Sequence, residues 1–182
     1  MVKACFFDRD GILNHLVKRE DGSYTAPWNV NEFEFVDFAK EAVSIVTNLG
    51  YGALCVTNQP DVYDGKLDKT HLNIMNRMCI NWLGLDDILC AYERGSAWYK
   101  PNNGMIETFI KKYNIDRSQS YIIGDRWKDI VAGHKSKLTT IYVGANYTKE
   151  QRPEKYKDIF PDYIVDSTLQ AATLIEELSY DD

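Results

Sequence analysis

The sequence predicts an α/β fold in which helices cover both faces of a doubly wound, mostly parallel β-sheet. Two features of the 182-residue chain support this prediction. Short apolar runs of strand length alternate with longer amphipathic runs of helix length, an alternation typical of parallel sheets with crossover helices. Small polar or acidic residues directly follow several of the apolar runs. In this architecture, ligands bind beyond the carboxyl ends of the strands.

The first half of the chain contains two strand-helix units. An uninterrupted apolar run predicts a strand over residues 2–7, and the turn-forming residues of 11–35 predict a loop or a small hairpin. A helix is expected over 37–48, because apolar residues recur at helical spacing and its first residue, an aspartate, can cap it. A second strand is expected over 53–56. The helix expected over 67–83 has one apolar face, formed by Leu72, Met75, Met78, Cys79 and Trp82.

The second half continues the alternation. Short apolar runs predict strands over residues 88–91, 121–123, 139–143 and 163–165. Amphipathic spacing predicts helices over residues 103–113, 129–135 and 168–178. A polar stretch over 146–157 predicts a surface loop.

Composition limits the classes of function. The net charge of −6 argues against non-specific nucleic-acid binding, which needs a basic surface. No apolar run approaches the roughly 20 residues of a membrane span, and the first residues make a poor secretion signal. The four cysteines form no C-x-x-C pair, which favours reduced core thiols. We therefore expect one cytoplasmic domain over residues 1–182, a monomer without membrane or nucleic-acid partners.

Acidic residues follow two of the expected strands. Asp8 and Asp10 come after the first strand, and Asp125 and Asp129 follow the strand at 121–123. Carboxylates gathered there can share a hard cation such as Mg²⁺, or one can act as a nucleophile while another transfers protons. A simple turn explains Asp and Gly after a strand equally well. Asp129 could be a metal ligand, an outer partner of the site or a helix cap.

Polar and cationic residues follow other strands. Thr57 ends the run at 53–56, and its hydroxyl with the following backbone N–H groups could hold a phosphoryl oxygen. Taken alone, a plain strand-to-turn transition accounts for it more simply. Lys100 lies before a helix and could neutralise a phosphoryl group, although most single lysines are solvated. Arg126, next to Asp125, could grip a substrate phosphate.

The order of these motifs is more specific than any one of them. Asp-x-Asp, Thr-Asn, Lys-Pro and Gly-Asp-x-x-x-Asp together resemble the four-motif signature of the haloacid dehalogenase superfamily of phosphatases, over residues 3 to about 143. Phe-Asp-Arg-Asp-Gly-Ile-Leu-Asn and Val-Thr-Asn-Gln resemble the branch that contains D,D-heptose 1,7-bisphosphate 7-phosphatase and histidinol-phosphate phosphatase.

The resemblance implies catalytic roles. Asp8 would be the nucleophile that forms an aspartyl-phosphate, and Asp10 would protonate the leaving oxygen and then activate water. Thr57 would bind the phosphoryl group, and Lys100 would balance charge at the nucleophile. Asp8, the backbone carbonyl of Asp10 and Asp125 would hold Mg²⁺, with Asp129 as a further metal candidate.

The resemblance also implies substrate contacts, and the chain departs from the family pattern in that region. Asn58, Gln59 and Arg126 would contact the substrate. Relatives often carry an arginine before the motif lysine, where this chain has Tyr99, so that contact is absent or supplied by Arg94. The zinc loop of three cysteines and one histidine, usual in that branch, is also lacking before Lys100, which argues against a four-coordinate zinc site in this loop.

The expected function is therefore Mg²⁺-dependent hydrolysis of a phosphomonoester of a small metabolite, most plausibly a sugar phosphate such as D-glycero-D-manno-heptose 1,7-bisphosphate. The alternatives are a histidinol-phosphate phosphatase, a phosphatase of nucleotides or nucleic-acid ends, and a non-catalytic protein that binds a phosphorylated ligand. The gaps between motifs hold no cap domain, so the site should be open. Its nearest cover would be the loop from Gly11 to Val30, with four candidates for substrate contact: His15, Arg19, Tyr24 and Trp28.

Overall fold

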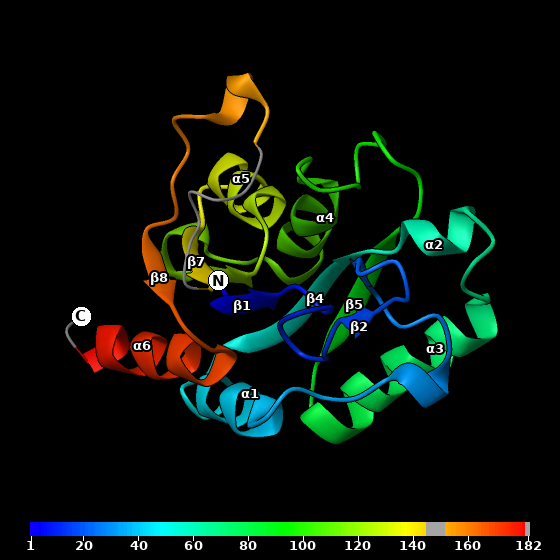
Figure 1. Ribbon diagram of the computed structural model, residues 1–182. Helices are drawn as coiled ribbons and strands as arrows, with labels where there is room; N and C mark the ends of the chain where they lie inside the picture. Colours follow the sequence, from blue (N-terminus) through cyan, green and yellow to red (C-terminus); the bar gives the residue numbers. More distant parts are fainter. Residues whose placement is uncertain (145–151, 181–182) are drawn as a thin grey trace.

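A six-stranded parallel sheet forms the centre of the computed structural model, which describes residues 1–144 and 152–180 (Figure 1). Its strand order is β5-β4-β1-β6-β7-β8, and all five pairings are parallel. The strands are β1 (Ala4–Phe7), β4 (Gly52–Asn58), β5 (Asp87–Ala91), β6 (Tyr121–Gly124), β7 (Thr139–Val143) and β8 (Tyr163–Val165). This topology confirms the predicted doubly wound sheet and all six predicted strands, with small shifts at their ends.

Helices cover both faces of the sheet (Figure 1). One face packs against α1 (Ala39–Asn48), α3 (Lys69–Met78) and α6 (Thr168–Tyr180), and the other against α4 (Gly104–Tyr113) and α5 (Trp127–Lys135). Strand β1 shows why two cores form. Cys5 and Phe7 are buried in the first core and Ala4 and Phe6 in the second, because successive side chains of a strand point to opposite faces.

The segment between β1 and α1 contains the small hairpin that the sequence allows. Strands β2 (Val17–Lys18) and β3 (Tyr24–Thr25) pair antiparallel, and a 3₁₀ turn, η1 (Val30–Glu32), follows them. The predicted cap of α1 is wrong, because Phe38 rather than Asp37 occupies the N-cap, with a φ of 61° and no side-chain capping bond.

The helix predicted over 67–83 is divided. The side chain of Asp68 caps α3 by accepting a hydrogen bond from Thr70 N. From Cys79 to Leu83 the chain forms a π-helix, η2, in which wider turns change the direction of later side chains. Trp82 is therefore 50% exposed and stacks on Phe35, so its predicted place on the apolar face is wrong. Leu83 is buried instead.

The described residues also form three further short elements: α2 (Pro60–Tyr63), which the sequence did not predict, η3 (Arg117–Gln119) and η5 (Glu154–Tyr156). The first part of the predicted loop at 146–157 lies outside the described residues. All four cysteines are free thiols, and three of them are buried. No helix in the described ranges has both the length and the apolar character needed to cross a membrane.

The sheet topology determines where a ligand can bind. Strand β1 lies between β4 and β6, so the chain leaves β1 toward one side of the sheet and later returns on its other side. Such a switch point opens a crevice at the carboxyl ends of the strands. Asp8, Thr57 and Asp125 lie at the carboxyl ends of these three strands.

Candidate active site

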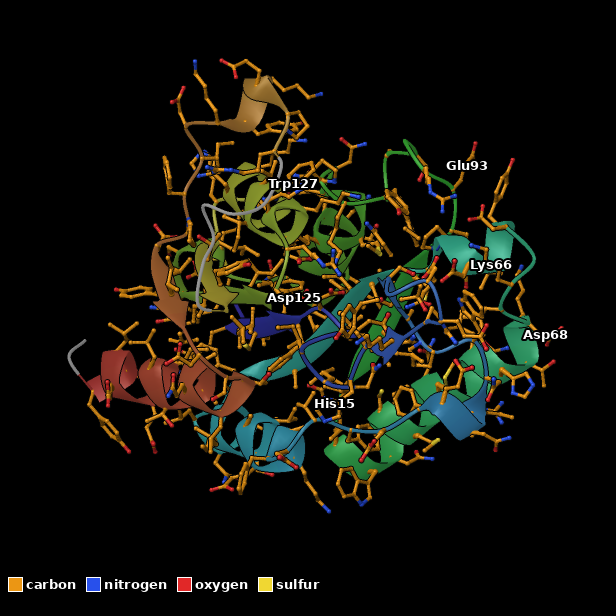
Figure 2. All side chains as sticks on the ribbon, viewed as in Figure 1. His15, Lys66, Asp68, Glu93, Asp125 and Trp127 are labelled. Atoms are coloured by element: carbon orange, nitrogen blue, oxygen red, sulfur yellow. The ribbon has the colours of Figure 1, made fainter. Side chains whose placement is uncertain are left out.

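A cavity of about 580 Å³ opens at the carboxyl ends of the central strands. Its floor includes Asp8, Asp10, Lys100 and Asp129, and Tyr24 and its neighbours line its wall. The segment after β1, which the sequence predicts as the nearest cover, therefore lines part of the cavity. In Figure 2, Asp125 lies at the end of the sheet and Trp127 lies beyond it on α5.

Lys100 is a buried cation of the site. Its Nζ donates hydrogen bonds to Asp8 Oδ1 at 2.8 Å, to Asp129 Oδ1 at 2.5 Å and to the carbonyl oxygen of Val56 at 2.7 Å. These contacts occupy all three of its hydrogens. Burial alone would lower the pKa of Lys100, but Asp129 and Asp8 raise it above its ordinary value. The ammonium group therefore stays charged beside Asp8.

Asp8 is held in a defined orientation at this ammonium group. Burial, the largest effect, raises its pKa to about 6, with Lys100 opposing the rise and Asp129 and Asp10 adding to it. Oδ1 accepts the bond from Lys100, and no protein donor in the described ranges bonds Oδ2. Asp8 also lines the cavity, so one carboxylate oxygen remains available for attack or for a cation.

Asp10 accepts hydrogen bonds from several side chains. Arg9 Nη2 lies 3.0 Å from Asp10 Oδ1, Asn14 Nδ2 lies 3.0 Å from the same oxygen, and Gln59 Nε2 lies 2.6 Å from Oδ2. Arg9, Asn14 and Gln59 are all completely buried. Charge-assisted bonds of this kind fix the orientation of the carboxylate. Asp10 is therefore positioned before any substrate binds.

The side chain of Asn58 forms two hydrogen bonds with the backbone of Lys100. Its Oδ1 accepts a hydrogen bond from Lys100 N at 2.9 Å, and its Nδ2 donates to Lys100 O at 3.0 Å. Both polar atoms of the amide are thus committed to one residue. Although Asn58 lines the cavity, its side chain positions Lys100 in this structure.

Three carboxylates form a group that could hold a metal ion. Oxygen atoms of Asp8, Asp125 and Asp129 all lie within 4.8 Å of one another. Asp125 Oδ1 is buried and has no hydrogen-bond partner, and burial, followed by Asp8 and Asp129, raises the pKa of Asp125 well above its ordinary value. A buried carboxylate oxygen without a donor is costly. An all-oxygen donor set suits Mg²⁺, so the residues present fit this cation.

Gly11 and Asp129 affect the geometry of the candidate metal site. A Cβ at Gly11 would lie 2.3 Å from Asp125 Oδ2, so only glycine leaves room for this carboxylate. Asp129 Oδ1 accepts a hydrogen bond from Lys100 Nζ. Asp129 Oδ2 accepts one from the backbone N–H of Arg126, and this bond caps the N-terminus of α5. This geometry favours two of the roles predicted for Asp129, a partner of Lys100 outside the metal's own ligands and a cap of α5. Direct binding of a metal by Asp129 stays a prediction.

The two arginines predicted to contact the substrate differ. Arg126 lines the cavity with a half-exposed side chain, and its Nε lies 3.7 Å from Asp125 Oδ2. Arg94 lies outside the cavity lining and forms two bonds to the carboxylate of Asp64, at 2.8 and 2.7 Å. Only Arg126 is thus placed where a ligand in the cavity could meet it.

The four loop residues predicted to contact the substrate also differ in where they lie. Tyr24 lines the cavity. The guanidinium of Arg19 lies 3.6 Å from the ring centroid of Trp28 and is paired with Glu32, so these two side chains stabilise the loop itself. His15 is exposed and lies outside the cavity lining. One of the four candidates therefore lies at the cavity.

Comparison with known proteins gives matches along most of the chain. The model of the HAD-hydrolase-like family matches residues 97–171. A D-glycero-beta-D-manno-heptose-1,7-bisphosphate 7-phosphatase of Helicobacter pylori is 30% identical over 145 residues, which cover 75% of this chain and 80% of that protein. The chain belongs to the haloacid dehalogenase (HAD)-like phosphatases. A D-glycero-D-manno-heptose-1,7-bisphosphate 7-phosphatase of Chlorobaculum tepidum is 28% identical and covers 94% of this chain and 92% of its own.

Solved structures confirm the fold of this HAD-like phosphatase. A D,D-heptose 1,7-bisphosphate phosphatase from B. bronchiseptica, complexed with magnesium and phosphate, superposes with a TM-score of 0.80 at 19% identity. The match covers 97% of this chain and 99% of that one. A HAD-like phosphatase from Mesorhizobium loti gives a TM-score of 0.76 at 22% identity and covers 98% of this chain and 87% of that one.

Sequence reasoning missed one buried member of the site. Arg9 is the middle residue of the Asp-x-Asp motif, yet it is completely buried and bonds both Asp10 and Asn76. An arginine that directly follows a buried strand, between two acids, was the available signal. Gln59, predicted to bind substrate, bonds Asp10 and Thr57 instead and does not line the cavity.

Proposed function

We propose that this HAD-like phosphatase hydrolyses a phosphomonoester of a phosphorylated sugar with the help of Mg²⁺, within one domain spanning residues 1–182. The favoured substrate is D-glycero-D-manno-heptose 1,7-bisphosphate, which the names of its relatives specify. The observation that carries the proposal is the pairing of Lys100 with Asp8 at the floor of the cavity, beside a fixed Asp10. Phosphoryl transfer depends mainly on positioning and charge neutralisation.

In the first step, an oxygen of Asp8 bonds to phosphorus while the bond between phosphorus and the sugar oxygen breaks. Asp10 gives its proton to that leaving oxygen, so the sugar leaves as an alcohol. Lys100 keeps Asp8 oriented and ionised for attack. Thr57 is buried outside the cavity lining, and its hydroxyl lies 3.5 Å from Asp10 Oδ2. It is the proposed phosphoryl contact.

In the second step, Asp10 takes a proton from a water molecule whose oxygen attacks phosphorus. The bond between phosphorus and Asp8 breaks, which releases inorganic phosphate and restores both carboxyl groups. Asp8 and Asp125 would hold Mg²⁺, with the backbone carbonyl of Asp10. The bound ion supplies positive charge next to the phosphoryl group and the carboxylates.

Phosphate release from a substrate panel tests this proposal. The panel contains heptose 1,7-bisphosphate, heptose 7-phosphate, histidinol phosphate, nucleotides and an aryl phosphate, each with Mg²⁺ and with a chelator. We expect Mg²⁺-dependent release, fastest from the heptose esters. The first variant is Asp8→Asn, for which we expect a fall in kcat of at least about 1,000-fold, because a lost nucleophile costs orders of magnitude.

Asp166→Asn is the matched control, because Asp166 is exposed and lies outside the cavity lining. It should behave as the native protein does. Retention of more than a few per cent of activity by Asp8→Asn would overturn the nucleophile assignment. Absence of release from every compound by a folded, Mg²⁺-loaded protein would overturn the proposed activity.

A further inference from the structure

The outer wall of the cavity contains a lysine that the proposed chemistry does not use. Lys128 lies in the first turn of α5 and lines the cavity together with Tyr99 and Arg126. Its Nζ lies 5.6 Å from the ring centroid of Tyr99 and 5.8 Å from that of Trp127. The two rings hold the cation in place by favourable cation–π contact.

Lys128 has no anionic partner among the described residues, where no carboxylate oxygen lies within 4.0 Å of its ammonium nitrogen. Arg126 lines the same part of the cavity, so positive charge is concentrated at this part of the wall. A partly buried cation next to another cation is stabilised when an anion binds between them.

Most other cations in or near the cavity have a carboxylate partner, and the longest of these pairs is Arg126 Nε to Asp125 Oδ2, at 3.7 Å. Lys100 is paired with Asp8 and Asp129, and Arg9 with Asp10. Arg94, the cation expected to replace the arginine missing at position 99, is held by Asp64. A second anionic group on the substrate would thus meet Lys128 and Arg126.

We infer that Lys128 is a specificity-determining residue, which binds the distal phosphate of a bisphosphorylated sugar while the other phosphate lies at Asp8. Tyr99 is the platform that positions its ammonium group. This inference rests on the proposed function, since it names which sugar phosphates that same site prefers. It predicts that a sugar bisphosphate binds better than the corresponding monophosphate, and that Lys128 provides much of the difference.

Calorimetric binding tests this inference without turnover. The titrations use Asp8→Asn protein with Mg²⁺, and the two probes are heptose 1,7-bisphosphate and heptose 7-phosphate. The quantity of interest is the ratio of the two affinities. Adding Lys128→Met should lower this ratio about 10- to 100-fold, the usual range for loss of a charged contact to phosphate. Lys128→Arg should keep most of it, because the charge remains.

Lys111→Met is the matched control, because Lys111 is an exposed lysine of α4 outside the cavity lining. It removes the same charge and should leave the ratio unchanged. Equal ratios in the Lys128→Met and Lys111→Met proteins would overturn the role of Lys128, and so would equal affinity of the Asp8→Asn protein for both probes. Turnover by the native enzyme is measured separately, so its absence would count against the proposed function alone.

Discussion

Asn58 fixes the backbone of Lys100, a proposed catalytic residue, through hydrogen bonds of its own side chain. Its amide bonds both the N–H and the carbonyl of Lys100, so the lysine backbone cannot shift without breaking two hydrogen bonds. Lys100 Nζ in turn holds Asp8 and Asp129. The orientation of the proposed nucleophile therefore depends on an amide that need not touch the substrate.

Asn58→Ala should lower kcat about 10- to 100-fold, because a small misplacement of catalytic groups costs roughly this much. The free energy of unfolding should also fall, by about 1–3 kcal/mol, since two partly buried backbone groups lose their partner. Steady-state kinetics and urea unfolding measure the two effects. Asn73→Ala, at an exposed position of α3, is the control. A kcat equal to that of the native enzyme would show that Lys100 keeps its place unaided.

At the residue scale, the sequence predicts where a side chain lies better than which groups it hydrogen-bonds. Asp8, Thr57 and Asp125 could be placed together because the carboxyl ends of adjacent parallel strands meet. The partners of Asn58 and Gln59 could not be predicted, because they depend on which donors and acceptors the folded chain brings near. Arg9 was overlooked for the same reason, since Asn76, one of its partners, lies on a distant helix.

At the scale of elements, a hydrogen-bonded cluster joins α4, η3 and the end of α5. Glu107 accepts two bonds from Arg117, at 2.7 Å each, and one from Ser136 at 2.8 Å. Arg117, the largest influence, together with Ser136 lowers the pKa of Glu107, with burial opposing them. A lowered carboxyl pKa stabilises the fold above the unfolded pKa of 4.5 and loses that effect as pH falls below it.

Glu107→Gln should therefore destabilise the protein at neutral pH and much less in acid. The expected cost is about 0.5 kcal/mol, because the pair is partly exposed and screened by solvent. Urea unfolding at about pH 7 and about pH 3.5 measures it, with Glu177→Gln, at an exposed position of α6, as the control. A difference between native and variant proteins that stays constant across this pH range would contradict the assigned cause.

The elements themselves were predicted with different success. All six strands were found because each is an uninterrupted apolar run, bounded by turn formers and too short to be a helix. The π-helix at Cys79–Leu83 was missed because the prediction applied the α-helical period of about 3.6 residues along the whole segment. Nothing in the local sequence marks the wider turn. The helix α2 is a single short turn, too short to produce a periodic pattern.

At the scale of the whole molecule, the carboxylates at the carboxyl ends of the central strands oppose folding when no cation is bound. The pKa of Asp8 rises from 3.8 to about 6 on folding. A raised carboxyl pKa means that the folded state binds more protons, so the free energy of unfolding falls as pH rises from about 4 to about 6. A cation at Asp8 and Asp125 would counter this loss above that range.

Mg²⁺ should raise the melting temperature at about pH 7.5 and have little effect at about pH 5, where protons compete for Asp8. With about 10 mM Mg²⁺ and a dissociation constant near 1 mM, the rise should be about 3–5 °C. Differential scanning calorimetry measures it, and chelator should reverse it. Asp125→Asn should abolish the effect, whereas Asp166→Asn should not. An equal rise at both pH values would argue against binding by these carboxylates.

The place of β1 between β4 and β6 also has a consequence for synthesis of the chain. On the ribosome, β1 and β4 emerge and can pair well before β6 has been translated. Until β6 arrives, one edge of the apolar strand Ala4–Phe7 is unpaired, and such edges associate with other chains. Nascent chains that stop before Tyr121 would thus have Asp8 without Asp125, and they would expose the edge of β1 that pairs with β6 in the finished protein.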